Sequence, residues 1–156
     1  MASVIEERSG PRKLALLIAN NEYCRQENRL SFPRSNAEQM GKMLKSIHVE
    51  AKIVCDVNKH DMVRIIADFS KTIRDHDLIL FYYCGHGCEV DGKNYLIPAS
   101  DARIETKRDV IDLALSVDSV LLRLVERNPS YATVMILDCC RLYTLKDASP
   151  SSNCKS

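Results

Sequence analysis

The chain has 156 residues, of which 46% are hydrophobic and 28% charged, so it is long enough for one compact domain with a core. Its 22 Lys and Arg residues balance 21 Asp and Glu residues, and a net charge of +1 offers no basic field to a nucleic acid or an anionic membrane. No apolar run approaches the ~18 residues of a membrane span, and the first residues lack a signal-peptide core, so we expect a cytoplasmic protein.

The seven cysteines form an odd number, and several lie inside apolar runs without a CxxC spacing. This pattern predicts free thiols instead of disulfides or a zinc site, and we expect no metal and no cofactor. The cysteines are Cys24, Cys55, Cys84, Cys88, Cys139, Cys140 and Cys154.

The two ends of the chain differ from its middle in composition. Residues 1–11 are polar and end in Gly10-Pro11, which predicts a short disordered lead. Residues 146–156 are polar and serine-rich, which predicts a linker or disordered tail. The expected domain therefore spans residues 12–145.

Four apolar runs predict the strands of a central sheet. Their nearly uninterrupted apolar content is typical of strands buried on both faces. The predicted strands are residues 14–19, 51–55, 78–84 and 132–137.

Three segments between these runs carry apolar residues at spacings of three and four, which predicts amphipathic helices lying on the sheet. The first helix is expected to begin at a capping box formed by Ser35 and Glu38 and to continue to Ile47. The other two predicted helices span residues 59–74 and 117–125.

The order of these elements predicts the fold class. Strands alternate with helices, which is typical of an α/β three-layer sandwich with a mainly parallel central sheet flanked by helices on both faces. Residues 88–99 are hairpin-like, with Asp91-Gly92 as the turn between the two arms.

Two reactive side chains follow predicted strands. Strand 78–84 leads into His86 between two glycines, and strand 132–137 leads into Cys140. Binding sites of open α/β sheets lie beyond the carboxyl ends of the strands, so parallel neighbours would bring the imidazole and the thiol together. A nearby imidazole can take the proton of a thiol, whose ordinary pKa is about 8.5, and so produce the nucleophile. The pattern indicates a catalytic dyad of His86 and Cys140.

Backbone groups beside both residues suit an oxyanion site. The N–H groups of Gly87 and Cys140 are predicted to hold the oxyanion, because glycine leaves its N–H unobstructed. From the residues alone two structural alternatives stay open. A histidine in such a loop can be merely solvated or structural, and a cysteine after an apolar run can be a small buried side chain.

The same residues resemble the motifs of a known protease clan. Phe81 to Gly87, FYYCGHG, is similar to the histidine motif of caspases, paracaspases and metacaspases, and Ile136 to Arg141, ILDCCR, is similar to their cysteine motif. The two motifs stand in the clan's order, about 50 residues apart. The resemblance covers about residues 12–145, is nearest to paracaspases, and implies a caspase-haemoglobinase-like large-subunit domain with cysteine endopeptidase activity and no cofactor.

The resemblance also implies a specificity. In paracaspases and metacaspases an acid two residues before the nucleophile lines a pocket for Arg or Lys at P1, the residue before the scissile bond. Asp138 has this position, which implies that its carboxylate pairs with the basic P1 side chain. The structural alternative is that Asp138 only binds the backbone of its own loop. Asn36 stands where paracaspases place a second acid, so the resemblance implies that Asn36 also binds the substrate. Because its amide is uncharged, the preference for Arg or Lys at P1 is expected to be weaker. Arg141 replaces the histidine that follows the nucleophile in metacaspases, so their calcium dependence is not carried over.

The clan continues after the nucleophile into a small subunit whose strands this chain lacks, which predicts an unpaired sheet edge. Beyond a peptide or protein substrate, the expected partner is a small-subunit fragment, a full-length relative or a second copy, and a fragment or short isoform is an alternative. The rival function is a catalytically weak caspase-like binding or regulatory module. A Rossmann-like nucleotide binder and a GxSxG hydrolase are disfavoured, because neither a Gly-rich loop after the first strand nor that motif is present.

Overall fold

A parallel four-stranded sheet forms the centre of the molecule. The computed structural model describes residues 10–129, 131–139, 143, 145 and 146. All four strands pair in parallel, and each predicted strand is confirmed to within one residue at either end. In their order across the sheet the strands are β2 (Glu50–Cys55), β1 (Lys13–Ala19), β3 (Leu78–Cys84) and β7 (Thr133–Asp138).

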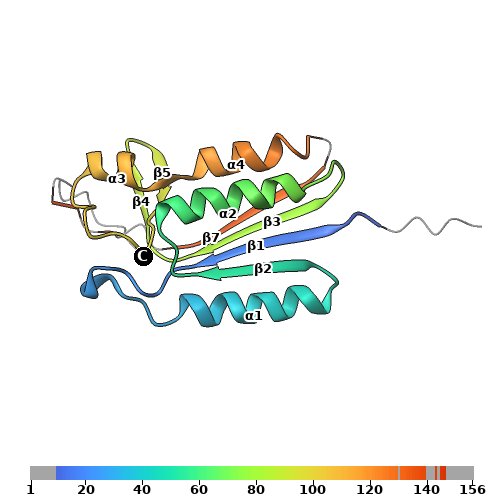
Figure 1. Ribbon diagram of the computed structural model, residues 1–156, viewed down its shortest axis with the longest axis horizontal. Helices are drawn as coiled ribbons and strands as arrows, with labels where there is room; N and C mark the ends of the chain where they lie inside the picture. Colours follow the sequence, from blue (N-terminus) through green and yellow to red (C-terminus); the bar gives the residue numbers. More distant parts are fainter. Residues whose placement is uncertain (1–9, 130, 140–142, 144, 147–156) are drawn as a thin grey trace, which may run out of the picture.

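Helices cover both faces of this sheet, which confirms the predicted α/β three-layer sandwich. Helix α1 (Pro33–Ser46) lies on one face, and α2 (Lys59–Thr72) and α4 (Val117–Val125) lie on the other (Figure 1). Successive strand residues point to opposite faces, so β1 contributes to two separate clusters of the core. Its residues facing α2 and α4 are Leu14, Leu16 and Ile18, and those facing α1 are Ala15, Leu17 and Ala19.

Helix α1 begins three residues earlier than predicted, since its N-cap is Phe32 instead of Ser35. Pro33 is its first residue and Phe32 its N-cap, without a side-chain cap. The Ser35 hydroxyl donates to the carbonyl oxygen of Phe32 at 2.9 Å, so the predicted capping box of Ser35 and Glu38 is wrong. Proline favours the first helical position because its fixed φ suits the helix and its missing N–H needs no partner there.

A hairpin beyond β3 begins a second, antiparallel sheet. Strands β4 (Gly87–Val90) and β5 (Lys93–Leu96) are joined by Asp91 and Gly92, whose φ angles are 50° and 77°. Two positive φ angles are what a tight type I′ turn requires, and the predicted turn is confirmed. Strand β5 also pairs with β6 (Leu115–Ser116), a short strand that no apolar pattern predicts.

A short helix, α3 (Lys107–Leu113), lies between β5 and β6. The Thr106 hydroxyl oxygen accepts from the N–H of Asp109 at 3.2 Å, and the Asp109 carboxylate accepts from the N–H of Thr106 at 2.8 Å. This is a capping box, and its Thr-x-x-Asp spacing is the signal that would have predicted the helix. Seven residues are too few to show a clear apolar period.

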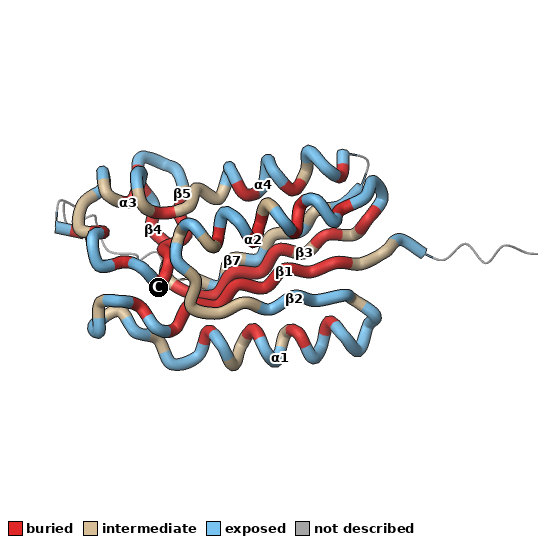
Figure 2. Tube along the Cα trace, in the orientation of Figure 1, coloured by how far each residue is buried: buried red, intermediate tan, exposed pale blue. Residues whose placement is uncertain are grey.

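The two outer strands are half exposed, so the prediction of strands buried on both faces is wrong for them. In β2 residues 50–53 are exposed, and in β7 Val134 and Ile136 are 44% and 39% exposed. Among the described residues each outer strand pairs with one neighbour only, while β1 and β3 form the buried centre (Figure 2). Within that part of the chain, β7 is the unpaired edge next to the predicted cysteine motif.

The described residues bear on the predictions about cysteines, metal sites and membrane spans. Five cysteines are free thiols, as predicted, and the remaining two, Cys140 and Cys154, lie outside the described residues. In the described ranges no group of three or more His, Cys, Asp or Glu residues could hold a metal ion. No helix described by the structure is both long and apolar enough to cross a membrane.

Arg12 and Asp77 form an ion pair at the amino end of the sheet. The Arg12 guanidinium donates from Nε to Oδ1 at 3.1 Å and from Nη2 to Oδ2 at 2.7 Å. Asp77 is only 3% exposed and also accepts from the N–H of Arg74 at 2.7 Å. The hydrogen bonds from Arg12 lower the pKa of the Asp77 carboxyl despite its burial.

We expect acid to remove the stability that this pair contributes. The pKa of Asp77 in the folded state lies below its ordinary value of 3.8, so the contribution is present above about pH 4 and is lost as the pH falls through the folded-state pKa. Asp77→Asn should lower the free energy of unfolding at pH 7 and make it less dependent on pH between about pH 5 and pH 2.5. Urea denaturation across that range measures both effects, and an unchanged pH dependence would contradict the prediction.

Candidate active site at the carboxyl ends of β3 and β7

His86 follows β3 and is held by its backbone. Its N–H donates to the Tyr23 hydroxyl at 2.7 Å, and its carbonyl oxygen accepts from the N–H of Ile97 at 3.0 Å and lies 3.0 Å from the Tyr83 hydroxyl. Burial raises the pKa of Tyr23 to about 12 and that of Tyr83 well above its ordinary value. Both side chains therefore stay neutral phenols, and the Cα of His86 has a fixed position.

Asn28 fixes the tautomer of the His86 imidazole. Nε2 of His86 lies 2.7 Å from the main-chain carbonyl oxygen of Asn28, the last residue of the 3-10 helix η1 (Gln26–Asn28). A carbonyl oxygen can only accept, so Nε2 carries the hydrogen and Nδ1 keeps its lone pair. The imidazole also contacts the rings of Tyr23 and Tyr143, with centroids 4.7 Å and 5.6 Å away. Nδ1 is thus the nitrogen able to accept a proton from a nucleophile.

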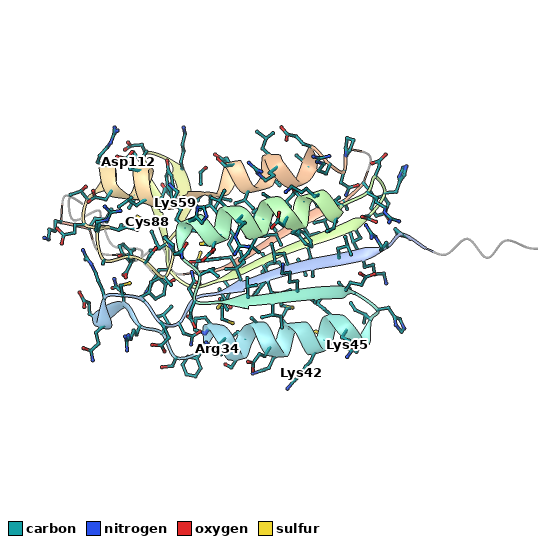
Figure 3. All side chains as sticks on the ribbon, viewed as in Figure 1. Arg34, Lys42, Lys45, Lys59, Cys88 and Asp112 are labelled. Carbon is teal, nitrogen blue, oxygen red and sulfur yellow. The ribbon has the colours of Figure 1, made fainter. Side chains whose placement is uncertain are left out.

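The loop that carries Asn28 is anchored to neighbouring elements. The Asn21 side chain donates to the carbonyl oxygen of Leu30 at 2.9 Å and accepts from the N–H of Arg34 at 2.7 Å. Arg34 lies at the start of α1 (Figure 3). Its guanidinium pairs with Asp56, directly after β2, at 2.6 Å. The loop between β1 and α1 is therefore tied to both α1 and the end of β2.

Asp138 and Asn36 lie close together around Cys84. Cys84 and Asp138 are partners in the register of β3 and β7. Oδ2 of Asp138 accepts from the Tyr82 hydroxyl at 2.9 Å and from the Cys84 thiol at 3.5 Å, and Nδ2 of Asn36 lies 3.8 Å from the Cys84 sulfur. Burial raises the pKa of the Cys84 thiol to about 11, so it stays protonated and donates at neutral pH.

A cavity of about 420 Å³ opens among these groups. His86, Asn36, Asp138 and Cys139 line it, and they come from the end of β3, the start of α1 and the end of β7. Asp138 is an exposed residue, so solutes can reach its carboxylate. One opening therefore presents the imidazole of His86 and the carboxyl group of Asp138 at the edge of the sheet where the sequence predicted these two residues.

Gly87 lies against the end of β7. A Cβ atom at Gly87 would be 2.8 Å from the Cys139 sulfur, closer than real contacts of this kind. Because Gly87 has no side chain, β4 can start beside Cys139. This glycine therefore has a packing role that is separate from its predicted role as an oxyanion donor. The N–H of Gly87 as an oxyanion donor stays a prediction. Cys140, the predicted nucleophile, lies outside the described residues.

Three residues around His86 were not predicted from the sequence: Tyr23, Asn28 and Tyr143. Tyr23 follows the first strand, and the rule that sites lie beyond strand ends could have pointed to it. Asn28 contributes a main-chain oxygen to His86, which no residue type signals. Tyr143 lies three residues after Cys140, so its closeness to that residue in the chain was the available signal.

Comparison with known proteins shows the family of this chain. The caspase domain family, Peptidase C14, matches residues 12–155. The chain belongs to the caspase domain family. The match includes both motifs, His86 with its flanking glycines and Cys140 with Asp138, and it confirms the resemblance predicted from them.

Two curated relatives and one solved structure resemble this caspase domain. The mucosa-associated lymphoid tissue lymphoma translocation protein 1 of Homo sapiens is 25% identical over 129 residues, and its Mus musculus homolog is 24% identical over 129 residues. Each match covers 83% of this chain and 15% of the relative, so the chain spans a small part of the relatives' length. With the family match, they support a caspase-like, paracaspase-related domain. The crystal structure of a Geobacter sulfurreducens protein has a TM-score of 0.65 at 16% identity, covering 83% of this chain and 51% of that one, and shows the same fold.

Proposed function

We propose that this caspase domain acts as a cysteine endopeptidase of the cytoplasm, with His86 as general base and Cys140 as nucleophile. The observation that carries the proposal is the cavity lined by His86, Asp138 and Cys139. Cys140 follows Cys139 directly in the chain, and the proposal assigns its thiol to this opening. Free thiols persist in the cytoplasm, and membership of the family supports a peptide or protein substrate.

The proposed reaction begins with transfer of the Cys140 thiol proton to Nδ1 of His86. The thiolate attacks the scissile carbonyl carbon, and the N–H groups of Gly87 and Cys140 hold the negative oxygen that forms. The imidazolium gives its proton to the leaving amine as the C–N bond breaks, which leaves a thioester. Nδ1 then takes a proton from water, the hydroxide displaces the sulfur, and the proton returns to the thiolate. Throughout, the Asn28 carbonyl oxygen accepts from Nε2 and stabilises the charged ring.

The cavity also suggests which residue precedes the scissile bond. Tyr82 and Cys84 donate to the same oxygen of Asp138, Oδ2, and so orient the carboxylate. Oδ1 accepts no hydrogen bond from the described residues, and the proposal assigns it to a guanidinium or ammonium group of the substrate. Asn36 adds an amide but no charge. We therefore propose a preference for a basic P1 residue that depends on a single carboxylate.

Two substitutions should change this preference in opposite directions. Asp138→Asn is expected to lower kcat/KM for an arginyl peptide by roughly 10–100-fold, because a hydrogen bond to a charged group contributes about 1.5–3 kcal/mol. Asn36→Asp should raise kcat/KM for the same peptide by adding a second negative charge. The measurement is hydrolysis of fluorogenic peptides that differ only in having Arg, Lys or Asp at P1.

Two further variants control this experiment. Cys140→Ala reports any contaminating protease, and Asp112→Asn changes an exposed carboxylate on α3, away from this cavity (Figure 3). A wild-type preference for Asp at P1, or an equal loss on all three peptides in Asp138→Asn, would refute the role of Asp138.

Strand β7 pairs only with β3 in the part of the chain that the structure describes, and this edge supports a second candidate function, a catalytically weak caspase-like module that binds or regulates a partner. Val134 and Ile136 are exposed there, and the matched solved structure is about twice as long as the part that this chain covers. A small-subunit fragment, a full-length relative or a second copy is the proposed partner for this edge. Turnover that rises more steeply than chain concentration would support an active homodimer. A folded chain without turnover at any concentration would instead support the binding module.

A further inference from the structure

Asp101 is a buried acid that the proposed reaction does not use. It lies between β5 and α3 and is 0% exposed. Its Oδ1 accepts from the N–H of Arg25 at 3.0 Å, and its Oδ2 accepts from Nδ2 of Asn28 at 2.6 Å and from the Tyr143 hydroxyl at 3.0 Å. A buried carboxylate has lost its hydration, so a fold tolerates one only where donors replace the water.

Two of these three donors belong to residues that also contact His86. The carbonyl oxygen of Asn28 accepts from Nε2 at 2.7 Å, and the ring of Tyr143 lies edge-on to the imidazole. Burial, and after it the charge of Asp101, raises the pKa of Tyr143 well above its ordinary value, so its hydroxyl keeps the proton that it donates. The Asp101 carboxylate thus binds Asn28, whose carbonyl oxygen accepts from the imidazole, and Tyr143, whose ring contacts the imidazole.

Packing alone does not hold the carbonyl oxygen of Asn28. Helix η1, which ends at Asn28, is a single turn with no buried residue. The hydrogen bond of 2.6 Å from Nδ2 of Asn28 to Asp101 therefore holds this turn itself, in addition to the Asn21 contacts that anchor the rest of the loop. A shift of this segment would free Nε2 of His86 and allow the hydrogen to move to Nδ1.

We propose that Asp101 is a positioning residue that keeps the hydrogen of His86 on Nε2 through Asn28 and Tyr143. The proposal rests on the proposed function, because the tautomer matters for turnover only if Nδ1 takes the proton of a nucleophile. Tyr143 follows Cys140 by three residues, so the same carboxylate also anchors the chain shortly after the proposed nucleophile.

Asp101→Asn tests this role. An NH₂ group in place of Oδ2 would point at Nδ2 of Asn28 and at the Tyr143 hydroxyl, which both donate to Oδ2 in wild type. We expect kcat for the arginyl peptide to fall roughly 10–30-fold and KM to change less than about twofold. The direct measurement is ¹⁵N NMR of the histidine rings at about pH 8.5, where an ordinary imidazole is neutral. Wild type should show a protonated Nε2 and an unprotonated Nδ1 at His86, and Asp101→Asn should show averaged signals from two tautomers. The spectrum of His86→Gln assigns the signals.

Asp77→Asn is the matched control. Asp77 is also a buried carboxylate that accepts from three N–H groups, but it lies at the amino end of the sheet. Its loss should reduce stability and leave both the His86 signals and kcat as in wild type. Tyr143→Phe removes one donor and should shift the His86 signals less than Asp101→Asn and in the same direction. The effects of the two variants at Asp101 and Tyr143 should not add, because they act through one contact.

The outcomes separate this proposal from the protease proposal. Unchanged His86 signals in Asp101→Asn, or a loss of kcat no larger than that of Asp77→Asn, would overturn the role of Asp101. If wild type cleaves no peptide, the NMR signals still decide whether Asp101 sets the tautomer, because they need no turnover. If Asp101→Asn does not fold, unchanged signals in Tyr143→Phe overturn the role and shifted signals support it.

Discussion

Replacing His86 with glutamine is expected to lower kcat/KM for an arginyl peptide by roughly 10³-fold or more, because the proposed general base is lost. Glutamine retains an N–H group that can donate to the Asn28 carbonyl oxygen, in place of the 2.7 Å contact from Nε2, so the loop can keep its position. The lone pair of Nδ1 has no counterpart in glutamine. Since Asp138 and its donors are unchanged, KM should change little, and the loss should appear in kcat.

Steady-state hydrolysis and thermal unfolding of the same preparations measure this effect. His60→Gln is the matched control, because His60 is an exposed histidine in the first turn of α2 and does not line the cavity of His86. It should retain wild-type kcat and KM. Turnover of His86→Gln above about a tenth of wild type would mean that another group is the base, since a general base contributes at least about 10²-fold.

The centre of the fold could be predicted because its strands are covered on both sides. Strands β1 and β3 read as continuous apolar runs, and both lie inside the sheet between α1 and the pair α2 and α4. The same kind of run occurs in β7, yet Val134 and Ile136 are exposed there. An apolar run shows that a strand can be covered but not what covers it, so the sequence of β7 alone did not reveal that its side chains are exposed among the described residues.

The part of the candidate site that lies at the carboxyl ends of β3 and β7 could be predicted from the sequence. His86 was predicted because it follows an apolar strand, and Asp138 because the resemblance to paracaspases and metacaspases implies a role for an acid two residues before Cys140. The parallel register of β3 and β7 brings His86 and Asp138 to one cavity. The contacts of Asp101 could not be predicted in this way. They join loops that are far apart in the chain, and Asn28 acts on His86 through its main chain, so neither periodicity nor residue type records the connection.

Gly85 is the position where one added methyl group should reduce stability most. A Cβ atom there would lie 2.7 Å from the Tyr23 hydroxyl oxygen and 2.8 Å from that of Tyr83. Both hydroxyl groups are buried and hold the backbone of His86, so moving either one leaves a buried polar group without its partner. Overpacking and a lost buried hydrogen bond each cost about 1–3 kcal/mol, so Gly85→Ala should lower the free energy of unfolding by about 3 kcal/mol and the Tm by roughly 10 °C.

Gly41 in the middle of α1 provides the matched control for Gly85→Ala. A Cβ atom at Gly41 would lie 2.6 Å from Cδ1 of Ile53, but that atom is the end of a side chain that is 37% exposed on the edge strand β2, so it can turn away. Alanine also favours a helix over glycine by about 1 kcal/mol. Gly41→Ala should therefore melt at the wild-type temperature or above it, while Gly85→Ala melts earlier and loses turnover even where it is folded, because His86 moves with the two tyrosines. Equal melting temperatures for the two variants would show that the tyrosine hydroxyls can yield and do not fix His86.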